Sequence, residues 1–171
     1  MITYTKLPIE EIEYLDLKPI IHSLMRSVRC LAPAILIKFD IKTSTVIYVS
    51  RLELEQVIMN LCLNAIHAME NQGELHLEIN DHSESHKEVI VRDTGKGIQT
   101  EDLPYIFDAF FTTKQHQGGT GVGLANVKQL VERWGGTITV QSTVGLGTQF
   151  SITIPTAPPK NTANTQLDPQ L

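Results

Sequence analysis

Six of the eleven glycines lie between positions 95 and 123, and two short runs contain most of them. Glycine permits a positive φ and a close approach of the backbone, which a phosphate-binding loop needs. The second run, Gly119-Thr120-Gly121-Val122-Gly123-Leu124, leads into a predicted helix, whose first N–H groups favour an anion. It lacks a following Gly-Lys-Ser/Thr and a preceding strand, so it is neither a P-loop nor a dinucleotide-binding fingerprint. The alternative is a flexible loop that starts a helix.

The first run is Asp93-Thr94-Gly95-Lys96-Gly97-Ile98, which follows a predicted strand. A carboxylate at the end of a strand can accept a hydrogen bond from an amino group, such as the exocyclic amine of adenine. Glycines beside it would let a flat base lie against the backbone. Taken alone, however, Asp-Thr-Gly is also typical of an Asx turn.

A polar stripe on a predicted long helix is the third feature with chemical potential. Asn60, Asn64, His67 and Asn71 are spaced i, i+4, i+7 and i+11, so they share one face. Amide oxygens are hard ligands that suit Mg²⁺ held together with substrate phosphates. The alternative is a solvated helix face, and we favour it for Asn71 at the helix end.

The elements that must position these residues follow from the pattern of apolar residues. Apolar residues at helical spacing predict helices over 17–31, from a capping-box pattern at Ser50 to about residue 71, and over 122–134. Runs of β-branched residues predict strands at 35–41, 45–49, 75–79, 89–92, 137–141 and 149–154, with a polar turn at 81–87. Because hairpins accompany the alternation, we expect a mixed sheet with helices on one face rather than a doubly wound parallel sheet.

Composition limits the class of protein. The chain has 171 residues, of which 42% are hydrophobic, and its net charge is -5. This indicates one globular domain and argues against a general binder of nucleic acids or acidic membranes. No apolar run approaches the roughly 20 residues of a membrane helix, and no secretory signal is evident. Cys30 and Cys62 lie in apolar patterns, which predicts two buried thiols; one disulfide is the alternative.

Four motifs, taken in order, resemble the ATP-binding domain of sensor histidine kinases. They are Asn60-Leu61-Cys62-Leu63-Asn64-Ala65-Ile66-His67-Ala68, the Asp93 run, Ile106-Phe107-Asp108-Ala109-Phe110-Phe111-Thr112-Thr113-Lys114 and the Gly119 run. Gly145-Leu146-Gly147-Thr148 resembles a last glycine turn of this family. The resemblance covers about residues 15–155. Each motif alone is weak, but four in this order are highly specific.

The resemblance implies the fold and the domain limits. The fold is α+β, a two-layer sandwich in which a mixed, mostly antiparallel sheet of about five strands is covered on one face by three helices. Gyrase, Hsp90 and MutL ATPases share this Bergerat-type fold. Residues 1–14 are then a linker from a missing phosphoacceptor hairpin, 15–155 the ATP-binding domain, and 156–171 a flexible tail.

The resemblance also implies one Mg-ATP between the asparagine helix and a lid at about 102–120. Asn64 corresponds to the Mg²⁺ ligand, Asn60 to a phosphate or water contact and Asp93 to the carboxylate that reads adenine. The implied nucleotide-binding positions are Asn60, Asn64, His67, Asp93, Gly95, Gly97, Ile98, Phe110, Thr113, Lys114, Gly119, Thr120, Gly121, Val122, Gly123, Leu124 and Thr148.

Two positions depart from the patterns of related families. Gyrase-like ATPases carry a glutamate, acting as general base, where this chain has Asn60; an amide cannot take a proton, so we expect slow hydrolysis. Many histidine kinases carry a lysine where this chain has His67, which would contact phosphate well only when protonated. His22 lacks the adjacent acid and downstream proline of a phosphoacceptor motif, so we expect no catalytic residue and no autophosphorylation in this chain alone.

The function that the resemblance implies is transfer of the ATP γ-phosphoryl group to a histidine on a separate dimerisation hairpin. The implied partners are that hairpin, in a parent kinase that is a homodimer, and a response regulator downstream. The isolated domain would be a cytoplasmic monomer that contacts neither nucleic acid nor membrane, whether or not its parent is membrane-anchored. The alternatives are a serine kinase of the anti-sigma-factor type and a non-catalytic module gated by nucleotide.

Overall fold

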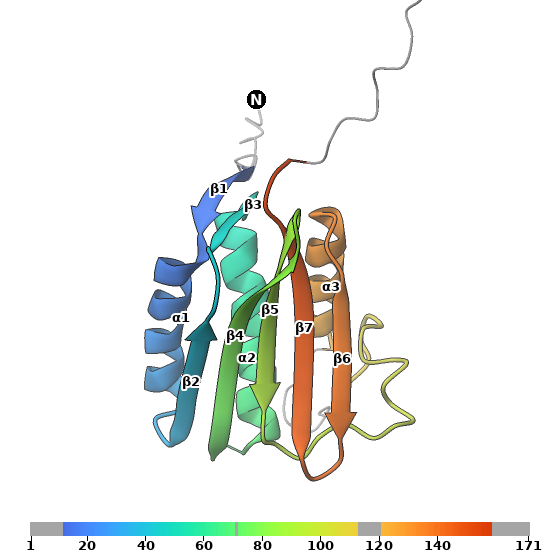
Figure 1. Cartoon of the computed structure of the whole chain (residues 1–171). Coiled ribbons are helices and arrows are strands. Elements are labelled where there is room, and N and C mark those ends of the chain that lie inside the picture. The colour runs from blue at the N-terminus through green and yellow to red at the C-terminus, as the bar shows by residue number, and fades with distance from the viewer. Residues whose placement is uncertain (1–11, 71, 113–120, 159–171) are drawn as a thin grey trace, which may run out of the picture.

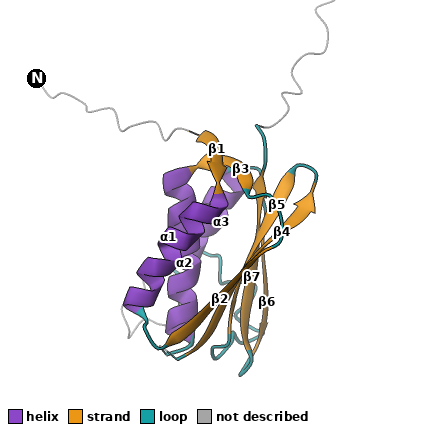
Figure 2. Ribbon diagram, turned by 60° about the vertical axis from the view of Figure 1, so that its left-hand side comes forward, coloured by secondary structure: helices purple, strands orange, loops and turns teal. Residues whose placement is uncertain are grey.

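A twisted sheet and a layer of helices on one of its faces make up the part of the chain that the computed structural model describes, residues 12–70, 72–112 and 121–158 (Figures 1 and 2). The sheet has five strands in the order β2-β4-β5-β7-β6. β2 and β4 are parallel, and the other neighbours are antiparallel. This confirms the predicted mixed, mostly antiparallel sheet with helices on one face. The strands are β2 (Ile35–Ile41), β4 (Gly73–Ser83), β5 (His86–Asp93), β6 (Ile138–Thr143) and β7 (Gly147–Pro155).

Two further strands form a separate two-stranded sheet. β1 (Ile12–Asp16) pairs antiparallel with β3 (Val46–Ser50), and Tyr14 lies opposite Tyr48. The strand predicted at 45–49 therefore exists but does not join the large sheet. Ile47 and Val49 are fully buried, so one face of this small sheet closes the core above α2.

The three predicted helices are present: α1 (Leu17–Leu31), α2 (Arg51–Ala68) and α3 (Gly123–Arg133). Within the described residues, none of them is both long and apolar enough to cross a membrane. α2 ends earlier than the expected position near residue 71, because Glu70 turns the backbone into the left-handed region with a φ of 53°. Gly135, with a φ of 83°, follows α3 directly after its cap Trp134.

The capping box at the start of α2 is only half formed. The Ser50 hydroxyl accepts the Glu53 N–H at 3.5 Å, as predicted. The Glu53 carboxylate binds α3 instead: it accepts the indole N–H of Trp134 at 2.6 Å and pairs with Arg133. Glu53 is buried, and a buried carboxylate needs such partners. It therefore ties the start of α2 to the end of α3.

The core lies between the helices and the inner face of the sheet. Leu75, Leu77 and Ile79 alternate along β4 and are fully buried, whereas the residues between them face solvent. On that outer face, Lys38 pairs with Glu74 at 2.8 Å across β2 and β4. This period of two is what a sheet with one covered face requires.

The hairpin between β4 and β5 differs from the sequence prediction. Residues 81–87 were expected to be a turn, but β4 continues to Ser83 and β5 begins at His86. The hairpin projects away from the helices (Figure 2), so residues 81–85 are exposed and lack the apolar alternation that marks a strand. Polar contacts hold it: Lys87 binds Asp81 and also donates to Thr43 at 3.1 Å.

The two cysteines have different surroundings. Both are free thiols; Cys62 is buried, as predicted, but Cys30 is exposed. The prediction was wrong for Cys30 because this residue lies on the solvent side in the last turn of α1. Burial raises the pKa of the Cys62 thiol to about 12, so this thiol is unreactive near neutral pH.

Asp16 links α1 to Thr45, the residue before β3, and gives the fold a pH-dependent contact. Its carboxylate accepts the Thr45 hydroxyl and, at 3.0 Å, the N–H of Lys18 in the first turn of α1. Both bonds lower the pKa of Asp16 below its ordinary 3.8, and the bond from Thr45 has the larger effect. A carboxyl group whose pKa is lower in the folded state stabilises the fold fully above the unfolded pKa, and loses this effect as the pH falls through the folded pKa.

We therefore expect Asp16→Ala to lower the free energy of unfolding by about 1 kcal/mol at pH 7, the usual effect of losing a helix cap. Urea unfolding of both proteins at pH 7 and at pH 3 measures this difference. The gap should shrink at pH 3, because this pH lies below the ordinary pKa of 3.8, where the contribution of the charged native form is already partly lost. An equal gap at both pH values would contradict the role of the charged form.

Candidate nucleotide-binding site

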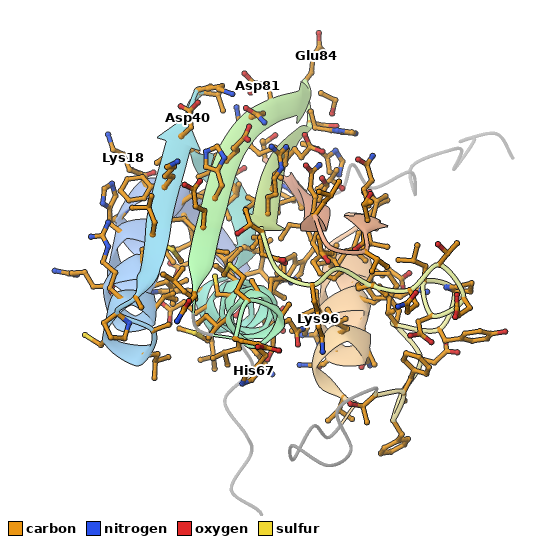
Figure 3. All side chains as sticks on the ribbon, turned by 90° about the horizontal axis from the view of Figure 1, so that it is seen from below. Lys18, Asp40, His67, Asp81, Glu84 and Lys96 are labelled. Carbon is orange, nitrogen blue, oxygen red and sulfur yellow. The ribbon has the colours of Figure 1, made fainter. Side chains whose placement is uncertain are left out.

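A cavity of about 570 Å³ opens between α2, the start of α3 and the ends of β5 and β7 that lie lowest in Figure 1. Figure 3 views the molecule from this end, where His67 of α2 and Lys96 are labelled. Pockets for small molecules have this size. It brings together ten of the predicted positions: Asn60, Asn64, His67, Asp93, Gly97, Ile98, Gly121, Gly123, Leu124 and Thr148.

The polar stripe of α2 forms one wall of this cavity. Asn60, Asn64 and His67 line it, as their spacing on one helix face predicted, while Leu61 and Ala65 between them are buried in the core. A Cβ atom added to Gly123 would come within 3.9 Å of Asn60 Oδ1. Asn60 therefore lies beside the first turn of α3, and the apolar cap Val122 cannot bond the N–H groups there.

Asp93, the last residue of β5, lines the cavity and is only 4% exposed. Its Oδ1 atom accepts two backbone N–H groups, from Gly95 at 2.8 Å and from Thr148 at 3.3 Å. These bonds offset part of the cost of burying the carboxyl group. They also orient it, because both donors belong to backbone of the fold.

Glycines beside Asp93 let backbone pack where side chains would not fit. Gly97 has a φ of +73°, and a Cβ atom there would lie 2.3 Å from the Thr143 carbonyl oxygen. A Cβ atom on Gly95 would lie 2.6 Å from the Ala68 carbonyl, so Gly95 packs against the end of α2 and does not line the cavity. The loop is fixed by two bonds of Lys96: its N–H donates to Ala68 O at 3.0 Å, and its C=O accepts from Gly145 N at 2.8 Å.

Apolar side chains complete the walls, and the sequence analysis missed them. They come from separate segments of the chain: Leu63, Ile106, Phe111, Val144 and Phe150. Apolar walls with few polar groups are typical of a small-molecule pocket. Each looks like an ordinary core residue in the sequence, and only Leu63, Ile106 and Phe111, which lie within the motifs named above, offered a signal.

Of the predicted lid, at about 102–120, the structure describes residues 102–112, and it describes the chain again from Gly121. Phe110 N donates to Gly121 O at 3.0 Å, and a Cβ atom on Gly121 would clash with the Phe110 backbone at 2.5 Å. The chain on either side of residues 113–120 is therefore held together. Phe110 is 77% and Val122 41% exposed, and neither lines the cavity; Thr113, Lys114, Gly119 and Thr120 lie outside the described residues. Nucleotide contact by these six residues, as by every other predicted position, stays a prediction.

The family model for histidine kinase-, DNA gyrase B- and HSP90-like ATPases matches residues 50–158. The chain belongs to this family. It is 44% identical over 102 residues to the sensor histidine kinase ZraS of Salmonella typhimurium. The matched stretch covers 60% of this chain and 22% of ZraS. The chain thus spans about a fifth of the length of the curated relatives that it matches.

Solved histidine kinases share the fold. The mycobacterial sensor histidine kinase MprB superimposes with a TM-score of 0.76 and 25% identity, over 85% of this chain and 97% of that one. Full-length ShkA, in complex with AMPPNP, superimposes with a TM-score of 0.72 and 25% identity, over 87% of this chain and 32% of that one. These likenesses confirm the predicted resemblance and the two-layer fold.

The residues of the cavity fit the ATP that membership of this ATPase family implies. A buried carboxylate can bind an amino group, Gly97 lines the cavity with backbone alone, and apolar walls surround both. Within the described ranges, no three His, Cys, Asp or Glu side chains gather as metal ligands. The Asn64 amide on the cavity wall carries a hard oxygen, the kind of ligand that Mg²⁺ takes together with substrate phosphates.

Proposed function

We propose that this chain is the ATP-binding catalytic domain of a sensor histidine kinase. It binds Mg-ATP and presents the γ-phosphoryl group to a histidine on a separate helical hairpin of the parent protein. The observation that carries the proposal is the buried Asp93 carboxylate in the wall of the cavity, with the amides of Asn60 and Asn64 on the α2 wall. The names of its relatives support the same reaction.

Each group of residues has a role in this proposal. Asp93 accepts the amino group of adenine, and Gly97, Ile98 and Phe150 hold the base. Asn64 ligates Mg²⁺, which neutralises charge on the phosphates, and the first N–H groups of α3 bind phosphate oxygens. Phosphoryl transfer depends mainly on positioning and on such neutralisation, so this chain needs no nucleophile of its own.

Asn60 is the reason to expect slow hydrolysis of bound ATP. Its amide lies beside the start of α3 but cannot accept a proton from water. We expect the chain alone to hydrolyse ATP at well below about 1 s⁻¹, the lower end of ordinary turnover. Phosphate release under saturating Mg-ATP measures this rate. Turnover at an ordinary enzymatic rate would mean that another group acts as the base.

The acceptor histidine lies outside this chain. His22 lies on α1, where the centroid of its ring is 4.8 Å from that of the Phe39 ring. It does not line the cavity. The test is incubation with γ-labelled ATP, with and without the parent's helical hairpin added in trans. We expect acid-labile label on the hairpin and none on this chain. Acid-stable label on a serine would favour the anti-sigma-factor type, and binding without any transfer would favour a non-catalytic module.

The remaining partners follow from the same proposal. The parent kinase would be a homodimer through its hairpin and would pass the phosphoryl group to a response regulator. The isolated domain would be a monomer on the cytoplasmic side, without contact to nucleic acid or membrane. Sedimentation of the isolated domain checks its monomeric state.

A further inference from the structure

Three polar side chains form a row across the sheet, beginning at the cavity wall. Asp93 of β5 lies directly opposite Thr148 of β7, and Thr148 lies directly opposite Ser142 of β6. Directly paired residues project to the same face of a sheet. Asp93 and Thr148 are each 4% exposed and line the cavity. Ser142, half-buried, lies at the outer end of the row and was not among the predicted site residues.

The Ser142 hydroxyl makes three hydrogen bonds. It accepts the N–H of Ile98 at 2.9 Å, donates to the carbonyl of Gly147 at 3.0 Å and lies 2.9 Å from the Thr148 hydroxyl. A hydroxyl has one proton, and the Gly147 carbonyl can only accept. The Ser142 proton therefore goes to Gly147, and in the third bond the Thr148 hydroxyl is the donor.

This direction of bonding determines what Thr148 offers to a ligand. Because its proton points to Ser142, the Thr148 oxygen can only accept on the cavity side. The neighbouring Asp93 is a carboxyl group, which accepts when ionised. Asp93 and Thr148 thus present acceptors side by side in the cavity wall, and these acceptors match a ligand edge that donates, as an amino group does.

We propose that Ser142 is a positioning residue that determines nucleobase specificity: by holding Thr148 as an acceptor, it makes the site prefer a 6-amino purine over a 6-oxo purine. The inference rests on the proposed function, since it assumes that a purine nucleotide occupies the cavity. Without the Ser142 hydroxyl, the Thr148 hydroxyl turns and donates to a 6-oxo group. Asp93 keeps its two backbone donors, so the carboxyl group stays in place.

The test compares ATP with inosine triphosphate, whose base has an oxygen in place of the amino group. Titration calorimetry gives the Kd of both ligands for wild type and for Ser142→Ala. We expect the wild type to prefer ATP, and the variant to lose about threefold to tenfold of this preference, the effect of one hydrogen bond. Because both ligands are titrated into the same sample, any loss of folded protein cancels in the ratio.

Two variants serve as controls. Ser142→Thr keeps the hydroxyl and should retain most of the preference. Ser151→Ala removes a hydroxyl from β7 that bonds only the Gln149 side chain, at 3.4 Å, among the described residues, and it should leave the ratio unchanged. If Ser142→Ala weakens both ligands equally, Ser142 only supports the loop and the inference is wrong. If the wild type binds no ATP at all, the proposed function fails first.

Discussion

Replacing Asp93 by asparagine is expected to weaken ATP binding about a hundredfold, the largest effect of any single change in this site. Oδ1 of Asp93 accepts the N–H groups of Gly95 and Thr148. In the variant these two donors will hold the amide oxygen, so the NH₂ group must occupy the other position. An amino group of adenine then meets a donor instead of an acceptor. Losing a bond to a charged group and opposing two donors together cost about 3 kcal/mol.

Calorimetric titration with ATP, with and without Mg²⁺, measures this change. Asp40→Asn is a matched control, because it makes the same change of charge on β2, in a residue that pairs with Lys42 and lies well away from His67 and Lys96 (Figure 3). Thermal unfolding of both variants checks that the fold is intact. If Asp93→Asn binds ATP within threefold of the wild type, Asp93 does not read the base.

Replacing Gly97 by alanine is expected to lower the free energy of unfolding by about 3 kcal/mol. Its φ of +73° is strained for any residue with a Cβ atom, at a cost of about 1 kcal/mol. The added carbon would also lie 2.3 Å from Thr143 O and 2.9 Å from Val144 Cα, both backbone atoms that cannot turn aside. Relieving such overpacking costs about 2 kcal/mol more.

Gly145→Ala separates these two causes. Gly145 has a similar φ of +80°, but a Cβ atom there meets nothing within 4 Å. We expect this control to lose only about 1 kcal/mol, the cost of the backbone conformation alone. Urea unfolding of both variants gives the comparison. If both variants lost the same free energy of unfolding, the loop at Gly97 would be able to move away from the β6–β7 turn at little cost. This loop would then not hold the base in a fixed position.

The two variants also separate binding from stability. Asp93→Asn changes one group in a site whose backbone bonds can all be kept, so it should affect binding far more than unfolding. Gly97→Ala should affect both, because the loop that carries it is bonded to α2 through Ala68 and to the β6–β7 turn through Gly145. Moving this loop moves the floor of the cavity relative to Asp93.

Local patterns in the sequence were enough to predict where the three helices and the motifs lie. The period of apolar residues located α1, α2 and α3, and the spacing of Asn60, Asn64 and His67 placed them on one wall of the cavity. The position of Asp93 at the end of a strand was also predicted from the sequence. These features depend on neighbours within a few turns of the chain, and such neighbours leave a periodic pattern.

Only the tertiary structure decided which distant segments meet. Nothing in residues 12–16 indicates that they pair with β3, about 30 positions away, and the exposed end of the β4–β5 hairpin has no apolar alternation to reveal it. The row of Asp93, Thr148 and Ser142 exists because β5, β7 and β6 are neighbours in register. A serine in a strand carries no local sign of the hydroxyl it will meet, since strand order and register are set by packing of the whole sheet on its helices.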